Sequence, residues 1–374
     1  MASSPQLKNH LIHQLINTTR LKSDGDAMVL LALSGKEPFS IFRYVVEARA
    51  HAYTDRGDIV IKCSSPYTPL SAPLEFETEA SKRLVIRFVR DLLVDSSPSK
   101  DLPFEKITNL TIRHYAKPFT SILNSWTDLE VLKMCDISDA FFDDFFDDFV
   151  NTSLPNLRKL ELGLTLKGCI KLMTVTPPVP LPEDVTLLLT VRERALAAFD
   201  SPNTFPTVKH LTATVQVWTE LTVEVLNRLS TIINCFTGLE TAKLELSYDH
   251  HPGKKEFEGI VNFHEWLRNT KFSAPIEIDF KEFVDISYNE DIESVYAQLK
   301  SIGFEEDGIP FYLVMKKEFG NVKLVHRVEH YDATSDNEEL WADEVQDFLN
   351  DLAVDDDVYS DGDFSYDDDS DEAF

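Results

Sequence analysis

Leu157-Arg-Lys-Leu160-Glu-Leu162 is the clearest copy of the short motif that decides the fold of this chain. Its apolar positions are typical of a short β-strand with one buried face. Six copies of this L-x-x-L-x-L frame, the last keeping only its second half, lie between Ile107 and Phe280, and a helical pattern follows most of them. A strand and a helix that recur every roughly 20 to 50 residues indicate a solenoid. We therefore predict an α/β fold, an open solenoid with a curved parallel sheet and helices on its outer side. The other copies are Ile107–Ile112, Leu129–Met134, Val208–Ala213, Leu239–Leu244 and Ala274–Ile278.

Helical patterns separate the predicted strands. Residues 141–149 interleave Phe with Asp, which predicts a helix with a packed aromatic face and a solvated acidic face. A cation or partner site on the acidic face is the alternative. Between residues 168 and 206 the pattern is irregular, and only residues 184–190 suggest a further, irregular strand. Two other stripes have the spacing of one helical face, at Phe119, Ile122, Leu123 and Trp126, and at Val225, Leu226, Leu229, Ile232, Ile233 and Phe236.

Residues 1–100 form a region that precedes the repeats. Apolar spacing predicts a helix over residues 5–16, a strand over 58–62 and a helix over 71–93. A serine- and proline-rich turn then ends the region, so we assign residues 101–284 to the solenoid.

The chain changes character after Ile278. Residues 292–302 carry a helical stripe, and two apolar runs flank Gly320-Asn321, which predicts a β-hairpin. Terminal elements commonly cover the exposed core of a solenoid. Residues 285–331 are therefore predicted to form a C-terminal cap.

Residues 332–374 form an acidic tail. Ser335 to Glu338 match a helix capping box, which predicts one short amphipathic helix. An isolated helix of this length is marginal, so we expect it to dock on the cap or on a partner. Beyond residue 355 the aliphatic content is too low for folding, and we expect disorder. The apolar face of the predicted tail helix consists of Trp341, Val345, Phe348, Leu349 and Leu352.

The formal net charge of −28 arises mainly in the tail. Residues 331–374 hold 18 Asp and Glu and no Lys or Arg, which leaves 46 acidic and 36 basic residues in the rest of the chain. Nucleic-acid affinity depends largely on Lys and Arg, so we expect no nucleic-acid partner. No apolar run reaches the length of a membrane span, and Met1 to Asn17 lack the core of a signal peptide. We expect a cytoplasmic or nuclear protein with no membrane partner.

Motifs for catalysis, metal binding and cofactor binding are absent from the sequence. Ser34-Gly35-Lys36-Glu37 lacks the upstream glycine and the hydroxyl residue of a phosphate-binding loop. The four cysteines form no C-x-x-C pair. His250 and His251 are interpreted as part of a polar turn before Pro252-Gly253, with a base or a metal ligand as the alternative. We therefore predict a protein that is not an enzyme and that binds no cofactor.

Four segments resemble the irregular leucine-rich repeats of mushroom-type (basidiomycete) fungal F-box proteins: Leu102–Ile112, Ser125–Met134, Leu154–Leu162 and Phe205–Leu211. The W-x-x-L-x-x-L and L-P-N-L-R-K-L-E-L steps carry the likeness, which covers about residues 100 to 250. It implies an irregular leucine-rich-repeat-like solenoid whose repeats hold a target protein. It also implies an N-terminal F-box that binds the adaptor of a cullin-type ubiquitin ligase. Residues 1–56 depart from the family, because they contain neither its L-P-x-E-[LI] opening nor its Cys-Arg-x-Trp-like end.

The predicted function is protein-protein interaction. The resemblance implies a role in substrate recognition for ubiquitin ligation. We expect the chain to be monomeric. In the repeat frame the leucines point into the core and the intervening residues face outward. Their mixed charge suits a protein ligand. In the alternative, the acidic tail binds a basic protein partner or folds back on Arg113, Lys133 and Lys159 as an autoinhibitory segment. The predicted binding residues are Thr111, Arg113, Lys133, Cys135, Lys159, Glu161, His210, Thr212, Lys243, Glu245, Glu277 and Asp279.

Overall fold

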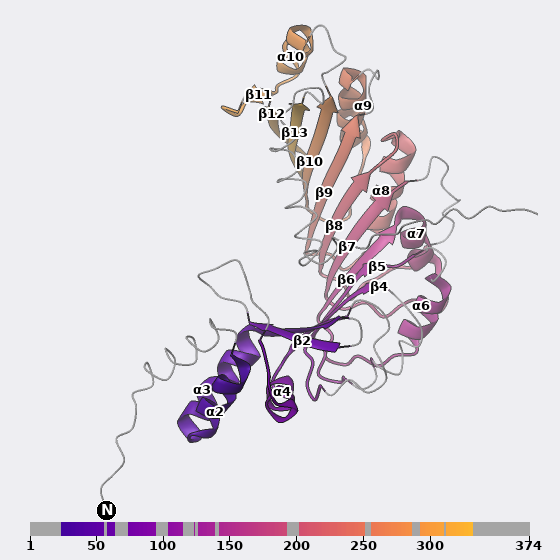
Figure 1. Ribbon diagram of the computed structural model, residues 1–374. Coiled ribbons are helices and arrows are strands. Elements are labelled where there is room, and N and C mark those ends of the chain that lie inside the picture. The colour runs from indigo at the N-terminus through magenta and orange to yellow at the C-terminus, as the bar shows by residue number, and fades with distance from the viewer. Residues whose placement is uncertain are drawn as a thin grey trace, which may run out of the picture. The chain divides into compact units, whose positions relative to one another are not determined.

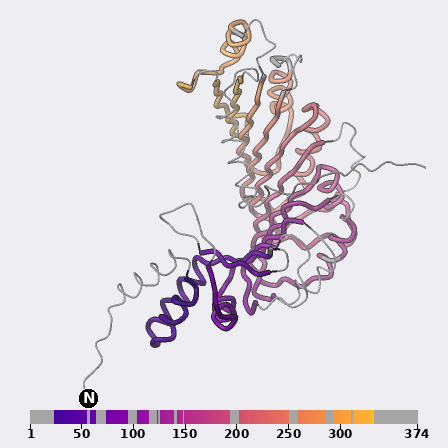
Figure 2. The backbone as a smooth tube through the Cα atoms, viewed as in Figure 1, coloured from indigo at the N-terminus to yellow at the C-terminus, as the bar shows by residue number. Residues whose placement is uncertain are grey.

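The chain has a mixed α/β architecture built on one mostly parallel sheet (Figure 1). In the described part of the chain this sheet has 13 strands, in the order β11-β12-β13-β10-β9-β8-β7-β6-β5-β4-β3-β1-β2. From β3 to β10 each strand pairs in parallel with the next strand along the chain. The colours of the backbone tube follow this order along the sheet (Figure 2). This order is compatible with the predicted solenoid. The computed structural model describes residues 24–55, 58–63, 74–94, 104–114, 123, 126–138, 142–192, 202–250, 256–285, 292–309 and 312–331.

The parallel strands keep one pairing register, which sets their apolar residues in columns across the sheet. Leu132 pairs with Leu110 on one side and with Leu160 on the other, and all three are at most 1% exposed. Met134 belongs to a second column, two residues further along each strand. Burying one large aliphatic side chain contributes about 1.5 to 3 kcal/mol, so these columns form the main part of the core. The strands are β4 (Asn109–His114), β5 (Val131–Asp136), β6 (Lys159–Thr165), β7 (Asp184–Val191), β8 (His210–Val217), β9 (Thr241–His250) and β10 (Ile276–Asp285).

All six predicted strands are confirmed by this order. The seventh, β7, lies where the pattern predicts only an irregular strand at 184–190. It is regular, because half-buried and buried residues alternate over its whole length and it pairs with both β6 and β8. The irregular part of the sequence before β7 includes part of helix α7 (Leu166–Thr174).

Helices α6 (Phe142–Val150), α7 (Leu166–Thr174), α8 (Val223–Asn234) and α9 (Glu256–Asn269) lie on one face of the sheet, and each contacts the next (Figure 1). On α6, Phe145 is 1% exposed whereas Asp143 is exposed, which confirms the predicted packed aromatic face. The ring of Phe142 lies against Gly168 of α7, where an added Cβ would be 1.9 Å from a ring carbon. The close approach of α6 and α7 therefore requires glycine at this position.

A turn from Trp126 to Leu129, with a buried tryptophan, comes directly before β5. The amide of Leu129 donates to the carbonyl of Trp126 at 3.2 Å, and the Trp126 ring is 5% exposed. The side chain of Asn156 donates from Nδ2 to the carbonyl of Thr127 at 2.8 Å, which joins the turn of one repeat to the turn of the previous repeat. Such hydrogen bonds hold successive repeats together on the edge where the strands begin.

The N-terminal elements continue the same sheet. The predicted strand at 58–62 is confirmed as β2, but the predicted helix over 71–93 is wrong in extent. Within residues 74–94 only α4 is helical, beginning after Thr78, whose Oγ1 accepts a hydrogen bond from the amide of Ser81. The end of the predicted helix is strand β3, because Leu92 pairs with Leu110 of β4 and is buried there. The elements are α2 (Gly25–Leu33), α3 (Lys36–Arg49), β1 (Ala50–Asp55), β2 (Asp58–Cys63), α4 (Glu79–Ile86) and β3 (Asp91–Val94).

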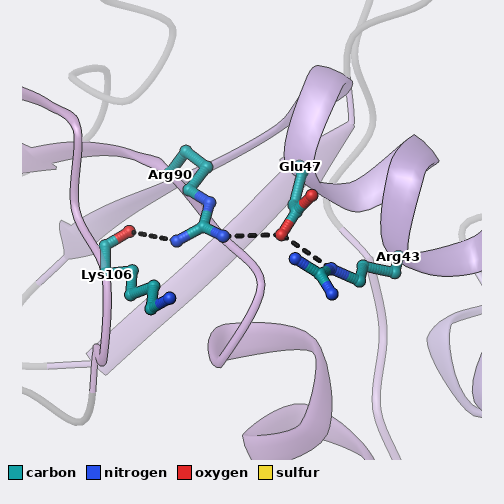
Figure 3. A network of polar contacts seen from close by, with 4 residues as sticks. All are labelled: Arg43, Glu47, Arg90 and Lys106. Atoms are coloured by element: carbon teal, nitrogen blue, oxygen red, sulfur yellow. Dashed lines mark hydrogen bonds and ion pairs between the residues drawn. The ribbon is translucent and has the colours of Figure 1, made fainter.

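Arg90 links the N-terminal helices to the repeats (Figure 3). Its Nη2 donates to Glu47 Oε1 on α3 at 2.6 Å, and its Nη1 donates to the carbonyl of Lys106 at 3.1 Å. Glu47 also accepts a hydrogen bond from Arg43 Nε at 3.0 Å. Burial alone would raise the pKa of Glu47, but the two arginines outweigh it and hold the pKa below its usual value. The sheet and this network are both continuous across the boundary that the sequence suggests near residue 100.

The predicted C-terminal hairpin is confirmed, and it extends the sheet. β12 and β13 pair antiparallel around Gly320, which has φ of 61°. β13 also pairs in parallel with β10 along the whole of both strands. Asn321 Nδ2 donates to the carbonyls of Phe272 at 3.1 Å and Ala274 at 2.8 Å, which fixes the turn of the hairpin beside the start of β10. The elements are α10 (Ile292–Ser301), β11 (Glu305–Glu306), β12 (Tyr312–Phe319) and β13 (Val322–Tyr331).

Several predictions lie outside the described residues. They are the helix over residues 5–16, Phe119 and Ile122 of the helical stripe that ends at Trp126, the polar turn at 251–253, the tail helix from Trp341 to Leu352 and the disorder beyond residue 355. Among the helices that the structure describes, none is both long and apolar enough to cross a membrane.

Candidate functional site

The predicted binding residues lie together on the sheet face opposite helices α6 to α9, which we call the strand face. Side chains alternate between the two faces of a strand, and the buried columns occupy the helix side. All of the predicted binding residues are half-buried or exposed, whereas their neighbours Leu110, Leu132 and Leu160 are buried. The structure therefore brings the whole predicted set onto one surface.

One row of the strand face crosses the sheet from β4 to β13. Consecutive members are paired residues of neighbouring strands, which are separated by about 4.8 Å. The row contains six of the predicted residues and ends at an exposed lysine of β13. Its members are Thr111, Lys133, Glu161, Thr186, Thr212, Lys243, Glu277 and Lys323.

The other predicted residues belong to the rows on either side. Lys159 and His210 both pair with Asp184, so all three lie in the row nearer the starts of the strands. Glu245 pairs with Asp279 in the row nearer their ends. Arg113 and Cys135 follow Thr111 and Lys133 by two residues and face the same way.

Charges on the strand face are largely paired with one another. Lys133 Nζ lies 3.5 Å from Glu161 Oε2 on the next strand. Arg327 of β13 forms an ion pair and a hydrogen bond with Asp279 of β10. These pairs cross from strand to strand, so the surface has mixed charge without a large region of one sign.

Glu245 of the strand face has two side-chain partners. Its Oε1 lies 2.5 Å from Lys243 Nζ, and Thr214 Oγ1 donates to its Oε2 at 3.0 Å. Burial alone would raise the pKa of Glu245, but these two partners outweigh burial and lower the pKa. Glu245 therefore remains ionised at neutral pH, in a fixed orientation.

Beyond Asp184 and His210 at the starts of β7 and β8, the centre of the strand face is uncharged, and the sequence analysis missed it. Half-buried residues with hydroxyl, amide or aliphatic side chains occupy β7 and β8. The motif frame covers only the first part of each strand, and β7 lacks the motif, so these positions were not selected. The alternation in Asp184–Val191 is the signal that could have identified them. They are Thr186, Leu188, Thr190, Thr214 and Gln216.

Close strand contact shapes the surface near Cys135. Gly163 faces outward on β6, where an added Cβ would lie 1.8 Å from the carbonyl oxygen of Cys135. Burial, and to a lesser degree the charge of Glu161, raises the pKa of the Cys135 thiol. A protonated thiol is a poor nucleophile and a poor metal ligand. Cys135 is therefore a protonated, half-buried thiol of this face.

Two other cysteines are protonated for the same reason. Burial raises the pKa of Cys169, and it raises the pKa of Cys235 to about 11. Both side chains are buried in the helix layer. They contribute packing and not chemistry.

The helix side of the sheet contains a cluster that the sequence analysis did not find, which we call the buried triad. It consists of Glu282 on β10, His326 on β13 and His264 on α9, which are 2%, 0% and 5% exposed. His326 Nε2 lies 2.9 Å from Glu282 Oε1, and His326 Nδ1 lies 3.0 Å from His264 Nε2. The only local signal was that Glu282 and His326 occupy inward positions of their strands.

Two cavities are further candidate sites for a ligand. A cavity of about 400 Å³ lies at the ends of β5 to β7, and another of about 340 Å³ lies beside α6. Within the described ranges no group of three or more His, Cys, Asp or Glu side chains is arranged to hold a metal ion. The first cavity is lined by Asp136, Ile137, Ser138, Thr165, Leu166, Thr190 and Arg192.

Comparison with known proteins gives no family assignment. No protein-family model matches the chain, and no curated protein or solved structure matches it significantly.

Proposed function

We propose that this chain is a non-enzymatic protein-protein interaction module, built as an irregular leucine-rich-repeat-like solenoid, that binds a protein partner on its strand face. The observation that carries this proposal is the register of β4 to β10. It places the predicted binding residues in continuous rows on one face while α6 to α9 cover the other (Figure 1). Repeat architectures typically use such an extended surface for binding.

The chemistry of the strand face favours a protein ligand. Its charged residues neutralise one another across strands, as Lys133 does with Glu161, so long-range attraction of a polyanion is weak. Its centre offers hydroxyl and amide groups together with Leu188. Such a surface can hydrogen-bond to a polypeptide and also bury apolar groups.

A role in substrate recognition for ubiquitin ligation is the more specific form of this proposal. It rests on the resemblance of the repeat steps to fungal F-box proteins, in which the repeats hold the target. A cullin-type ligase adaptor is the further partner that this resemblance implies.

The second candidate function assigns binding to the acidic tail. The 18 acidic residues without a basic residue in 331–374 favour a basic protein partner. The same charge could also act within the chain, by occupying Arg113, Lys133 and Lys159.

Reversing two charges tests the strand face. The double variant Arg113→Glu with Lys133→Glu should remain folded by circular dichroism but lose most of the partners that the wild-type chain captures from a cell extract. The matched control is Arg83→Glu with Lys300→Glu, which also removes two cations and breaks ion pairs on α4 and α10. Unchanged capture by the strand-face variant would contradict the proposal.

Removing the tail separates the two candidate functions. Deletion of residues 332–374 should leave capture intact or increase it if the strand face binds the partner. Loss of every partner on deletion, with the strand-face variant unaffected, would assign binding to the tail.

A further inference from the structure

The two strand residues of the buried triad, Glu282 and His326, occupy inward positions that are mostly apolar elsewhere in the sheet. Across the sheet, His326 continues a row formed by Leu164, Leu189, Val215, Leu246 and Phe280. Glu282 pairs with Tyr248 on one side and with Val328 on the other. Ionisable groups buried at such positions are costly unless they are paired with each other.

Aromatic rings enclose the triad. The ring of Phe280 stacks on His326 with centroids 4.5 Å apart, and the ring of Phe304 stacks on His264 at 6.2 Å. Phe263 lies edge-on to His326 at 5.6 Å. These contacts exclude water from the imidazoles, so the three groups depend on one another for hydrogen bonds.

The geometry limits how many protons the triad can hold. Two imidazole nitrogens 3.0 Å apart, His326 Nδ1 and His264 Nε2, can share one proton between them. A proton on His326 Nε2 can be donated to Glu282 Oε1, which lies 2.9 Å away, so the carboxylate can balance one imidazolium. Charging the second imidazole would make two N–H groups face each other and would leave a buried positive charge unbalanced.

The surroundings of the triad oppose the second proton. Burial and then the nearby His326 lower the pKa of His264 to about 3, against the opposing effect of Glu282. Lys317 of β12 and Arg268 of α9 act in the same direction as burial.

Other titratable groups near the triad lie on β9, α10 and β13. Tyr248 of β9 is close enough to feel the charge of Glu282, and burial raises its pKa. Tyr296 of α10 packs against His330 of β13, with ring centroids 5.0 Å apart. None of these groups supplies a second carboxylate to balance a second imidazolium.

The direction in which pH changes stability depends on the protonation of His264 in the folded and the unfolded state. An unfolded histidine takes up a proton near pH 6.5, whereas the folded chain resists it until far lower pH. Below about pH 6.5 the open state therefore binds more protons than the closed state, and the closed state loses stability as the pH falls.

We propose that the C-terminal end of the sheet is a proton-sensitive element, in which β12 and β13 separate from β10 and α9 when both imidazoles of the buried triad become charged. The opening is local, because β13 is held by β10 on its inner side and the triad lies at that junction. On the strand face, the same separation breaks the ion pair of Asp279 with Arg327. This end of the surface would thus change with pH while β4 to β9 remain folded.

Hydrogen exchange of the full chain tests the proposal. The quantity measured is the protection factor of each segment. Between about pH 7 and about pH 5 the protection of β12 and β13 should fall about tenfold or more, while that of β6 to β8 changes by less than about twofold. The fall should reverse when the pH is raised again. Unchanged protection of β12 and β13, or a loss that runs in step with β6 to β8, would overturn the proposal.

Two substitutions should move the opening in opposite directions. His264→Gln keeps a donor for His326 Nδ1 but cannot be charged, so opening should shift to lower pH. Glu282→Gln removes the group that balances the first imidazolium, so opening should shift to higher pH. His114→Gln, at an exposed histidine of β4, is the matched control and should leave the opening unchanged.

Opening of the His264→Gln variant at the wild-type pH would overturn the proposal. If that variant does not fold, the direction of the Glu282→Gln shift decides: a shift to higher pH supports the proposal, and no shift or a shift to lower pH overturns it.

Discussion

The middle of the sheet and its C-terminal end fill the same buried columns with different chemistry. In β6 to β8 the inward positions are aliphatic, as at Leu164, Leu189 and Val215. In β10 and β13 the equivalent rows contain Glu282 and His326. Pairing register therefore determines which positions are buried, whereas a neighbouring element determines which side chains are tolerated there. At the C-terminal end that element is α9, which supplies His264.

The strand face shows the opposite distribution. Its centre, over β7 and β8, is uncharged at Thr186, Leu188 and Thr214, while charged pairs lie towards both ends of the rows. The middle of the sheet is thus apolar inside, and its outer face over β7 and β8 is uncharged beyond Asp184 and His210. The C-terminal end is charged on both faces and depends on specific partners on each.

A charge buried in the aliphatic middle of the sheet should have the largest effect on stability. Leu160→Asp should unfold the chain, because an unpaired buried carboxylate costs several kcal/mol and total domain stability is about 5 to 15 kcal/mol. The neighbouring Lys159→Asp, which faces outward on the same strand, should leave the melting temperature nearly unchanged. A Leu160→Asp melt within about a degree or two of the wild type would show that this column is not a core column.

Removing one member of the buried triad should have the next largest effect. Glu282→Leu should lower the free energy of unfolding by about 3 to 5 kcal/mol, because it leaves the imidazoles buried without their carboxylate. The triple variant Glu282→Leu, His264→Leu and His326→Phe should recover most of that loss, since apolar replacement of a whole buried ionic cluster is often neutral or stabilising. Denaturant titration at neutral pH measures both. Equal stability of the single variant and the wild type would show that the triad is not coupled.

Close strand contact in the middle should give the smallest effect. Gly163→Ser should cost about 1 to 3 kcal/mol, because its Cβ would meet the backbone oxygen of Cys135 at 1.8 Å and β5 would have to move. Gly35→Ser is the matched control. Its Cβ would come no nearer than 3.6 Å to Pro38, and serine suits the start of α3. Similar denaturation midpoints for the two variants would argue against close packing of β5 on β6.

The repeat strands could be predicted because their signal is local. Leu129–Met134 and Leu157–Leu162 each contain the full pattern of one half-buried strand, and alternation then places Lys133 and Glu161 on the exposed side. The same reasoning failed at residues 71–93. There an apolar period compatible with a helix was overruled at its end by the pairing of β3 with β4.

Local sequence is sufficient to predict the α/β class, the positions of the repeat strands and which residues of the L-x-x-L-x-L frame face outward, because each of these depends on neighbours within a few residues. Two features depend on the tertiary fold: the C-terminal hairpin joins the sheet in parallel with β10, and Glu282, His326 and His264 meet in the core. His326 lies 44 residues from Glu282 and 62 from His264 along the chain. No local pattern encodes such a contact, because it forms only when the strands have paired and α9 has packed against them.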